Sequence, residues 1–181
     1  ALQGQHIFGQ IDAGFFFELG DDEVDDALVE VFAAQEGVAV GGQHFELVLA
    51  DLTDAAEAER AIRAHRPAVL WVESPSNPLL RISDIAALAA LGHEVGALVV
   101  VDNTFCTPLG QRPLQLGADF VVHSATKYLA GHSDVVSGAV VCSTDAQVEQ
   151  LAWWANCLGV TGGAFDSYLA LRGVRTLHAR M

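Results

Sequence analysis

The stretch Asp119-Phe-Val-Val-His-Ser-Ala-Thr-Lys127 joins a short apolar run to the only lysine of the chain. A continuous apolar run bounded by polar residues predicts a strand that is buried in a sheet. All other basic side chains are arginines, whose guanidinium does not readily lose a proton, whereas a neutral lysine amine can attack a carbonyl carbon. Lys127 is therefore a candidate catalytic residue that follows a buried strand.

Two hydroxyl groups stand just before this lysine. Ser124 and Thr126 lie at the expected end of the strand, where hydroxyls and backbone N–H groups together suit a phosphate group. The same residues also fit the start of a helix that is capped by Ser or Thr, with a lysine whose aliphatic stem lies along the surface. Both interpretations are open from the local sequence.

Outward from this strand, the sequence alternates between expected strands and helices. Short apolar runs and capping residues at this spacing predict an α/β fold with a mostly parallel sheet flanked by helices. Thr53 or Asp54 is the expected cap of one helix, and Ser83 or Asp84 is the expected cap of another, which Gly96 ends. The expected strands cover residues 45–49, 68–73, 97–102, 119–123 and 137–142, and the expected helices cover residues 53–65, 84–95, 113–116, 145–156 and 164–181.

The first part of the chain differs in composition from the remainder. Residues 1–60 contain 14 of the 23 acidic side chains and a single basic one, Arg60. We predict an acidic segment of unclear origin over residues 1–44, in which residues 27–36 could form a helix, and a second region over residues 45–181. An acidic run without the spacing of an EF-hand loop indicates a solvated face, so no metal site is predicted.

The overall composition argues against several classes of protein. A formal net charge of −14 disfavours nucleic-acid and anionic-membrane partners, and no apolar run approaches the roughly 20 residues of a membrane span. Cys106, Cys142 and Cys157 contain no CxxC pair, so we expect reduced core cysteines in a cytoplasmic protein. The chain begins at Ala1 and has its only methionine at Met181, so we expect a chain that is truncated at both ends.

Polar residues follow three of the expected strands at their carboxyl ends. Parallel strands share that edge, so Asn77, Asp102 and the turn at residues 124–127 should converge there. A buried Asp102 needs a cation, and the protonated ring nitrogen of an aldehyde cofactor on Lys127 would be one. Taken singly, Asp102 also fits a helix cap, Asn77 a turn residue, and Glu73 a solvated charge.

These motifs and the last part of the chain resemble the Cys/Met-metabolism family of pyridoxal-phosphate enzymes. The similarity runs in order and with the expected spacings over residues 45–181, and the tail is most similar to the cystathionine γ-synthase group. The motifs are Val72-Glu-Ser-Pro-Ser-Asn-Pro-Leu-Leu-Arg81, Val101-Asp-Asn-Thr-Phe105, His123-Ser-Ala-Thr-Lys-Tyr-Leu-Ala-Gly-His-Ser-Asp134 and the tail from Leu151 to Leu177.

The resemblance implies the large cofactor domain of a fold-type I, aspartate aminotransferase-like enzyme, which is incomplete in this chain. It implies that Lys127 holds pyridoxal 5′-phosphate as an internal aldimine and moves protons between substrate carbons. It further implies that Asp102 contacts the pyridine nitrogen and that Ser124 and Thr126 bind the phosphate. Asn77 is implied to lie near the phenolic oxygen and the substrate carboxylate.

The implied reaction is γ-replacement, in which an O-acyl-homoserine loses its acyl group and cysteine adds to give cystathionine. A cystathionine lyase or a homoserine sulfhydrylase of the same family is an alternative, because the shared motifs specify the cofactor and not the leaving group. A catalytically inactive fragment is another. The family forms tetramers, so a homo-oligomer is expected, and an exposed sheet edge would favour self-association.

The sequence also departs from the family pattern. Val40 stands where the family has a tyrosine that precedes a Gly-Gly pair, here Gly41-Gly42, and stacks on the cofactor ring. The Gly-Met phosphate loop of the family, and the Tyr and Arg that a neighbouring subunit contributes, are not recognisable in residues 1–40. The arginine that grips the substrate carboxylate would follow Met181. The resemblance therefore implies that this chain carries only part of an active site.

Overall fold

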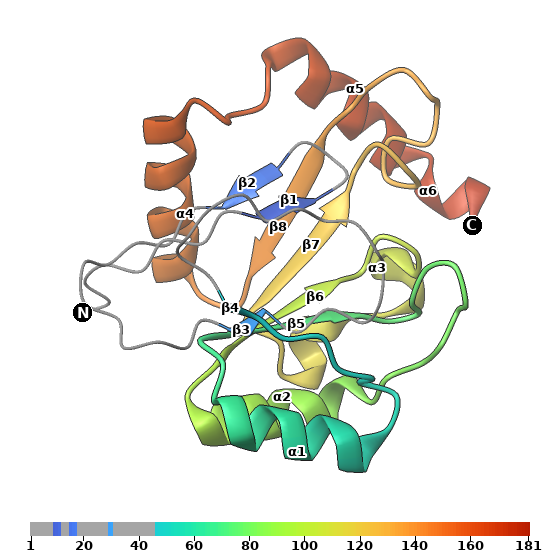
Figure 1. Cartoon of the computed structure of the whole chain (residues 1–181). Helices are drawn as coiled ribbons and strands as arrows, with labels where there is room; N and C mark the ends of the chain where they lie inside the picture. The colour runs from blue at the N-terminus through green and yellow to red at the C-terminus, as the bar shows by residue number, and fades with distance from the viewer. Residues whose placement is uncertain (1–8, 12–14, 18–28, 31–45) are drawn as a thin grey trace.

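The computed structural model describes residues 9–11, 15–17, 29–30 and 46–181, with side chains from Val48 onward. Six strands of these residues form one sheet in the order β4-β3-β5-β6-β7-β8 (Figure 1). Neighbours from β4 to β7 run parallel, and β8 runs antiparallel to β7. The strands are β3 Val29–Glu30, β4 Glu46–Leu47, β5 Val69–Glu73, β6 Leu98–Asp102, β7 Phe120–Ser124 and β8 Gly138–Cys142. The predicted α/β fold with a mostly parallel sheet is confirmed.

A separate antiparallel pair, β1 (Gly9–Ile11) with β2 (Phe15–Phe17), lies outside this sheet. Most of residues 1–44 lie outside the described residues, so the division of the chain at residue 45 stays a prediction. Within the expected helix over residues 27–36, the two described residues form strand β3, and the helix prediction is wrong there.

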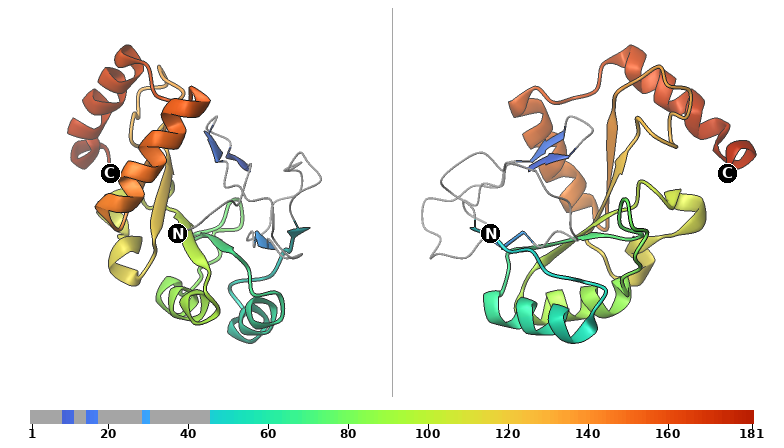
Figure 2. Two further views of the ribbon diagram at one scale, coloured as in Figure 1. Left: turned by 90° about the vertical axis from the view of Figure 1, so that its left-hand side faces the viewer. Right: turned by 45° about the vertical axis from the view of Figure 1, so that its right-hand side comes forward.

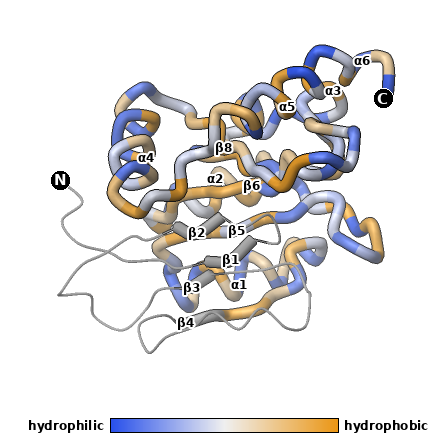
Figure 3. Tube along the Cα trace, turned by 90° about the horizontal axis from the view of Figure 1, so that it is seen from above, coloured by the Kyte–Doolittle hydropathy of each residue, from blue (hydrophilic) through white to orange (hydrophobic). Residues whose placement is uncertain are grey.

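Two helices, α1 (Ala55–His65) and α2 (Ile85–Val95), lie side by side and cover one face of the sheet (Figure 2). Alternate residues of the strands, such as Leu70 and Val99, point toward these helices and pack with Ile62 in the largest buried apolar cluster. The intervening residues of the strands form a second cluster on the other face. In Figure 3, β5 and β6 are hydrophobic through the middle of the molecule, as expected for strands buried on both faces.

Both helices on this face begin at an aspartate. Asp54 caps α1 by accepting the N–H groups of Ala56 and Glu57, and Asp84 caps α2 by accepting that of Ala87. Of the two caps expected for each helix, the aspartate is therefore the one used. The α2 helix ends at Gly96, whose φ of 89° is the left-handed conformation that glycine adopts most readily.

The remaining helices are α3 Thr107–Gly110, the 3₁₀-helix η1 Pro113–Leu116, α4 Asp145–Leu158, α5 Ala164–Arg175 and α6 Leu177–Arg180. The short α3 was not predicted, and the expected last helix is divided at Thr176. The antiparallel direction of β8 follows from its connection, because residues 125–137 contain no crossover helix of the kind that parallel neighbours need. No helix in the described part of the chain is long and apolar enough to cross a membrane.

The three cysteines are free thiols. Cys106 and Cys142 are half-buried, and burial raises the pKa of each thiol. Cys157 on α4 is exposed, so the expectation of a core cysteine is wrong for this position. Its helix contains no buried residue, so none of its side chains lies in the core.

Candidate active site

Three neighbouring parallel strands end at the same edge of the sheet with a polar residue. Strand β5 ends at Glu73, β6 at Asp102 and β7 at Ser124, and Glu73 is the direct cross-strand partner of Asp102. Lys127 follows Ser124 by three residues. The predicted convergence of these strand ends is confirmed, and this edge is the place where ligands bind in such sheets.

Asp102 is half-buried at the end of β6. One carboxylate oxygen accepts the backbone N–H of Thr104 at 2.8 Å, a local turn of the kind that aspartate often makes. No ion pair joins this carboxylate to a basic side chain within residues 48–181. Asp102 therefore forms a local turn and not the helix cap that the sequence also allowed, because α3 begins only at Thr107. Its charge has no salt-bridge partner among the described residues.

Ser124 and Thr126 differ in what their hydroxyls contact. Ser124 is only 6% exposed, and among the described residues its Oγ has no hydrogen-bond partner. The hydroxyl of Thr126 donates to the carbonyl of Ser137 at 3.2 Å and accepts its N–H at 3.0 Å. An unpartnered buried hydroxyl is unusual, so Ser124 is the hydroxyl that is free for a ligand, whereas Thr126 fastens the start of β8.

Lys127 is exposed and lies in a turn rather than in a helix. Its N–H donates to the carbonyl of Ser124 at 3.1 Å, and its own carbonyl accepts the N–H of Gly131 at 2.9 Å. The alternative of a capped helix start is thus not formed. The described residues do not enclose the side chain of Lys127.

Glu73 and Asn77 meet in the loop that follows β5. A carboxylate oxygen of Glu73 accepts the backbone N–H of Asn77 at 3.3 Å. Burial raises the pKa of Glu73 above its ordinary value; the Asn77 hydrogen bond lowers it, and the nearby charge of Asp102 raises it further. The side chain of Asn77 is exposed, so the structure fixes its backbone and leaves its amide open to solvent.

Two further residues at this edge were not singled out from the sequence. His123 is 5% exposed, and its Nδ1 has no partner in the described region. Burial lowers the pKa of His123, and the charge of Asp102 and a backbone hydrogen bond at Asn103 act in the opposite direction. Thr104 accepts the N–H of Ser124 at 2.7 Å and so ties β7 to the loop after β6. The sequence signal for His123 was a histidine at the end of an otherwise apolar strand.

The arrangement fits the groups of pyridoxal phosphate. The unpartnered Ser124 hydroxyl suits a phosphate oxygen, and the Asp102 carboxylate without a salt bridge suits a protonated ring nitrogen. Lys127, three residues after Ser124, supplies an amine in the turn that follows the same strand. Val40 and Gly41-Gly42, where the sequence departs from the family pattern, lie outside the described residues.

Two family models match the chain. The model described as Cys/Met metabolism PLP-dependent enzyme matches residues 35–181, which is most of the chain and includes every predicted site residue. The model described as NAD-specific glutamate dehydrogenase matches residues 1–64, less than half of the chain. The second match covers the acidic segment and overlaps the first over residues 35–64.

Individual relatives agree with the first of these families. The cystathionine γ-synthase of Escherichia coli (strain K12) is 62% identical over 125 residues, 69% of this chain and 32% of the relative. The cystathionine β-lyase of Coxiella burnetii is 42% identical over 188 residues, 98% of this chain and 48% of the relative. A solved structure of cystathionine γ-synthase from Xanthomonas oryzae pv. oryzae in complex with cystathionine is 46% identical, with a TM-score of 0.77 over 84% of this chain and 41% of that one. The chain therefore spans less than half the length of these relatives.

Proposed function

Because the chain belongs to the Cys/Met metabolism family of PLP-dependent enzymes, we propose that Lys127 binds pyridoxal 5′-phosphate for γ-replacement of an O-acyl-homoserine by cysteine. The product would be cystathionine. The observation that carries the proposal is the shared edge of β6 and β7, where Asp102 and Ser124 lie beside the Lys127 turn. When bound, the cofactor supplies an electron sink for carbanions of the substrate.

Each residue at the edge has a proposed task. Asp102 holds the proton on the ring nitrogen, and Ser124 donates a hydrogen bond to the phosphate. Thr126 can join it only by giving up its bond to the carbonyl of Ser137. Lys127 carries protons between substrate carbons as a general acid and base, and Asn77 lies near the phenolic oxygen and the substrate carboxylate.

Cofactor binding is tested with Lys127→Ala and with Lys127→Arg, which keeps the positive charge but has no amine that can attack a carbonyl. With pyridoxal phosphate, the unaltered chain should show more visible absorbance than its N-terminal α-amine alone can give, and both variants should fall to the level of that α-amine. Variants that keep the absorbance of the unaltered chain would contradict the role of Lys127. If the unaltered chain shows no such excess, the alternative of a catalytically inactive fragment is favoured.

The choice of synthesis over cleavage is supported by the names of the relatives at 62% and 46% identity. A cystathionine lyase is the second candidate, because the β-lyase relative matches 98% of this chain. Product analysis with O-acyl-homoserine plus cysteine, compared with cystathionine alone, distinguishes the two. We expect cystathionine to form; breakdown of cystathionine with no synthesis would favour the lyase. The proposal includes a homo-oligomer, which sedimentation of the same sample tests.

A further inference from the structure

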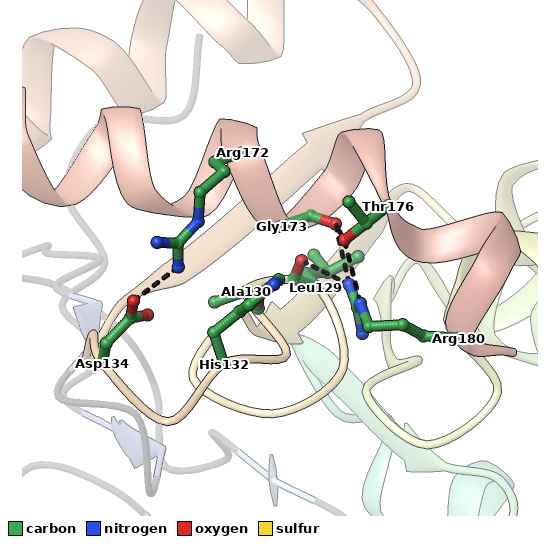
Figure 4. Close-up of polar contacts among 8 residues, drawn as sticks. All are labelled: Leu129, Ala130, His132, Asp134, Arg172, Gly173, Thr176 and Arg180. Carbon is green, nitrogen blue, oxygen red and sulfur yellow. Dashed lines mark hydrogen bonds and ion pairs between the residues drawn. The ribbon is translucent and has the colours of Figure 1, made fainter.

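The segment that follows Lys127 is held by the last helix of the chain (Figure 4). Arg180 on α6 donates from Nη1 to the carbonyl of Tyr128 at 2.8 Å and from Nη2 to the carbonyl of Leu129 at 3.4 Å. Its Nη2 also donates to the carbonyl of Gly173 on α5 at 2.7 Å. One guanidinium therefore joins the two residues after Lys127 to the end of α5.

These bonds supply donors that the turn lacks. Within the turn, the carbonyl of Lys127 is occupied by the N–H of Gly131. The carbonyls of Tyr128 and Leu129 accept hydrogen bonds only from Arg180 among the residues that the structure describes. Backbone carbonyls without a partner are costly, and bonds from a charged donor are stronger than neutral ones. Arg180 thereby stabilises this conformation of the turn.

The contact is close enough to require glycine on both sides. A Cβ at Gly131, where φ is 63°, would overlap the guanidinium of Arg180, and a Cβ at Gly173 would overlap the backbone of Ala130. The arginine is itself oriented by Thr176, whose hydroxyl accepts from Nε at 3.0 Å. The guanidinium is therefore fixed in direction and is not a loose surface charge.

Apolar and ionic contacts support the same junction. Leu177 on α6 is buried in a small cluster with Ala125 and Leu129, on either side of Lys127. Further along the loop, Arg172 of α5 forms an ion pair with Asp134. On the other side of Lys127, Thr126 is bound to β8 as described above. The backbone is thus held on both sides of Lys127 in the sequence, whereas the side chain of Lys127 is exposed.

We infer that Arg180 is a positioning residue for Lys127, since its fork of donors fixes the turn from which the amine projects. The inference rests on the proposed function, in which Lys127 binds the cofactor. A lysine at position 180 would keep the charge but would donate from a single point rather than from a planar fork. The orientation of Lys127 should therefore depend on the guanidinium and not only on the charge.

The experiment measures how fast pyridoxal phosphate, trapped by borohydride, labels Lys127 in the full chain. The N-terminal α-amine of the same molecule is the internal reference, and because Lys127 is the only lysine, peptide mass separates the two sites. Arg180→Ala should lower the ratio of lysine to terminal labelling by roughly tenfold or more, as expected for a displaced reacting group. Arg175→Ala, an exposed arginine at the end of α5, is the matched control and should keep the ratio of the unaltered chain.

A second measurement separates positioning from general damage. Pyridoxine 5′-phosphate has the ring and phosphate but no aldehyde, so its affinity reports the pocket without the amine. Arg180→Ala should change that affinity by less than about twofold while the labelling ratio falls. If both fall together, or if the ratio does not fall, the inference is overturned. Arg180→Lys should give a ratio of lysine to terminal labelling between those of the unaltered chain and Arg180→Ala. If Arg180→Ala does not fold, a ratio in Arg180→Lys equal to that of the unaltered chain overturns the inference.

Failure of the proposed function has a different signature. In that case pyridoxal phosphate would label Lys127 of the unaltered chain no faster than the terminal amine, and both the proposed function and the inference would be wrong. If pyridoxal phosphate labels Lys127 preferentially both in the unaltered chain and in Arg180→Ala, only the inference is wrong.

Discussion

The two helical regions of the molecule are attached to the sheet in different ways. Helices α1 and α2 bury side chains such as Ile62 and Leu88 in the main apolar cluster, and they lie away from α4 and α5 (Figure 2). The α4 helix has no buried residue, and α5 buries only Leu169 and Gly173. The main apolar cluster therefore stabilises the first region, whereas two small apolar clusters around Leu169 and Leu177, together with a few polar and glycine contacts, fasten the second.

The second region also exposes large apolar side chains. Trp153, Phe165, Tyr168 and Leu171 are each more than half exposed, at 59, 70, 60 and 52%. The rings of Trp153 and Trp154 contact each other edge to face with centroids 4.7 Å apart, although adjacent positions on a helix point in different directions. The Lys127 turn lies where this region meets the sheet, so its geometry depends on the weaker of the two attachments.

We expect the greatest loss of stability at a buried leucine of the first region, and an exposed leucine of the second region serves for comparison. Leu70→Ala empties a position that is 0% exposed in the main cluster and should cost about 2–5 kcal/mol of unfolding free energy. Leu171→Ala, at 52% exposed, should cost less than about 0.5 kcal/mol. Urea denaturation followed by circular dichroism measures both. Equal losses would show that α5 contributes to the core as much as β5 does.

A smaller loss of unfolding free energy is expected when the contact between α5 and the Lys127 turn is disturbed. Gly173→Ala places a Cβ against the backbone of Ala130, so α5 must shift, and we expect a loss of about 1–3 kcal/mol. The matched control is Gly110→Ala on α3, where the nearest atom to the added Cβ is 3.7 Å away. That variant should be neutral or slightly stabilising. If Gly173→Ala behaved like the control in urea denaturation, the close packing of α5 on the turn would be contradicted.

The first region, with the strands that it covers, could largely be predicted from the sequence. Strands β5, β6 and β7 were predictable because each is an apolar run bounded by polar residues, and the caps at Asp54 and Asp84 follow from local hydrogen bonding. These features depend on residues that are close in the sequence. The strand ends of the candidate site follow from them, because parallel strands share one edge.

The contacts around Lys127 could not be predicted in the same way. The bond from Arg180 to Tyr128 joins residues 52 positions apart, and no local pattern reports such a pairing. Nor does the sequence show that Ser137 occupies the hydroxyl of Thr126, which leaves Ser124 as the unpartnered one. The direction of β8 likewise depends on a turn rather than on the strand itself.

The smallest effect concerns Glu73, which stands beside Asp102 at the site edge. Its pKa is raised, chiefly by burial, so the folded state binds its proton more tightly than the unfolded state does. The contribution of Glu73 to stability is then fully present below the unfolded pKa, near 4.5, and is lost as the pH rises through the folded value. Ionised Glu73 should therefore destabilise the protein slightly at neutral pH.

Glu73→Gln removes that charge and keeps an oxygen that can accept the N–H of Asn77. We expect the variant to be more stable than the unaltered chain at pH 7, by about 0.5 kcal/mol after allowance for solvent screening, and equally stable at pH 4. The matched control, Glu149→Gln, changes an exposed carboxylate on α4 and should show no such pH-dependent difference. Thermal unfolding of the three proteins between pH 4 and pH 8 measures the effect. A gain that appears only at low pH would mean that the carboxylate of Glu73 is stabilised in its charged form, and burial would then not be the dominant influence at the site edge.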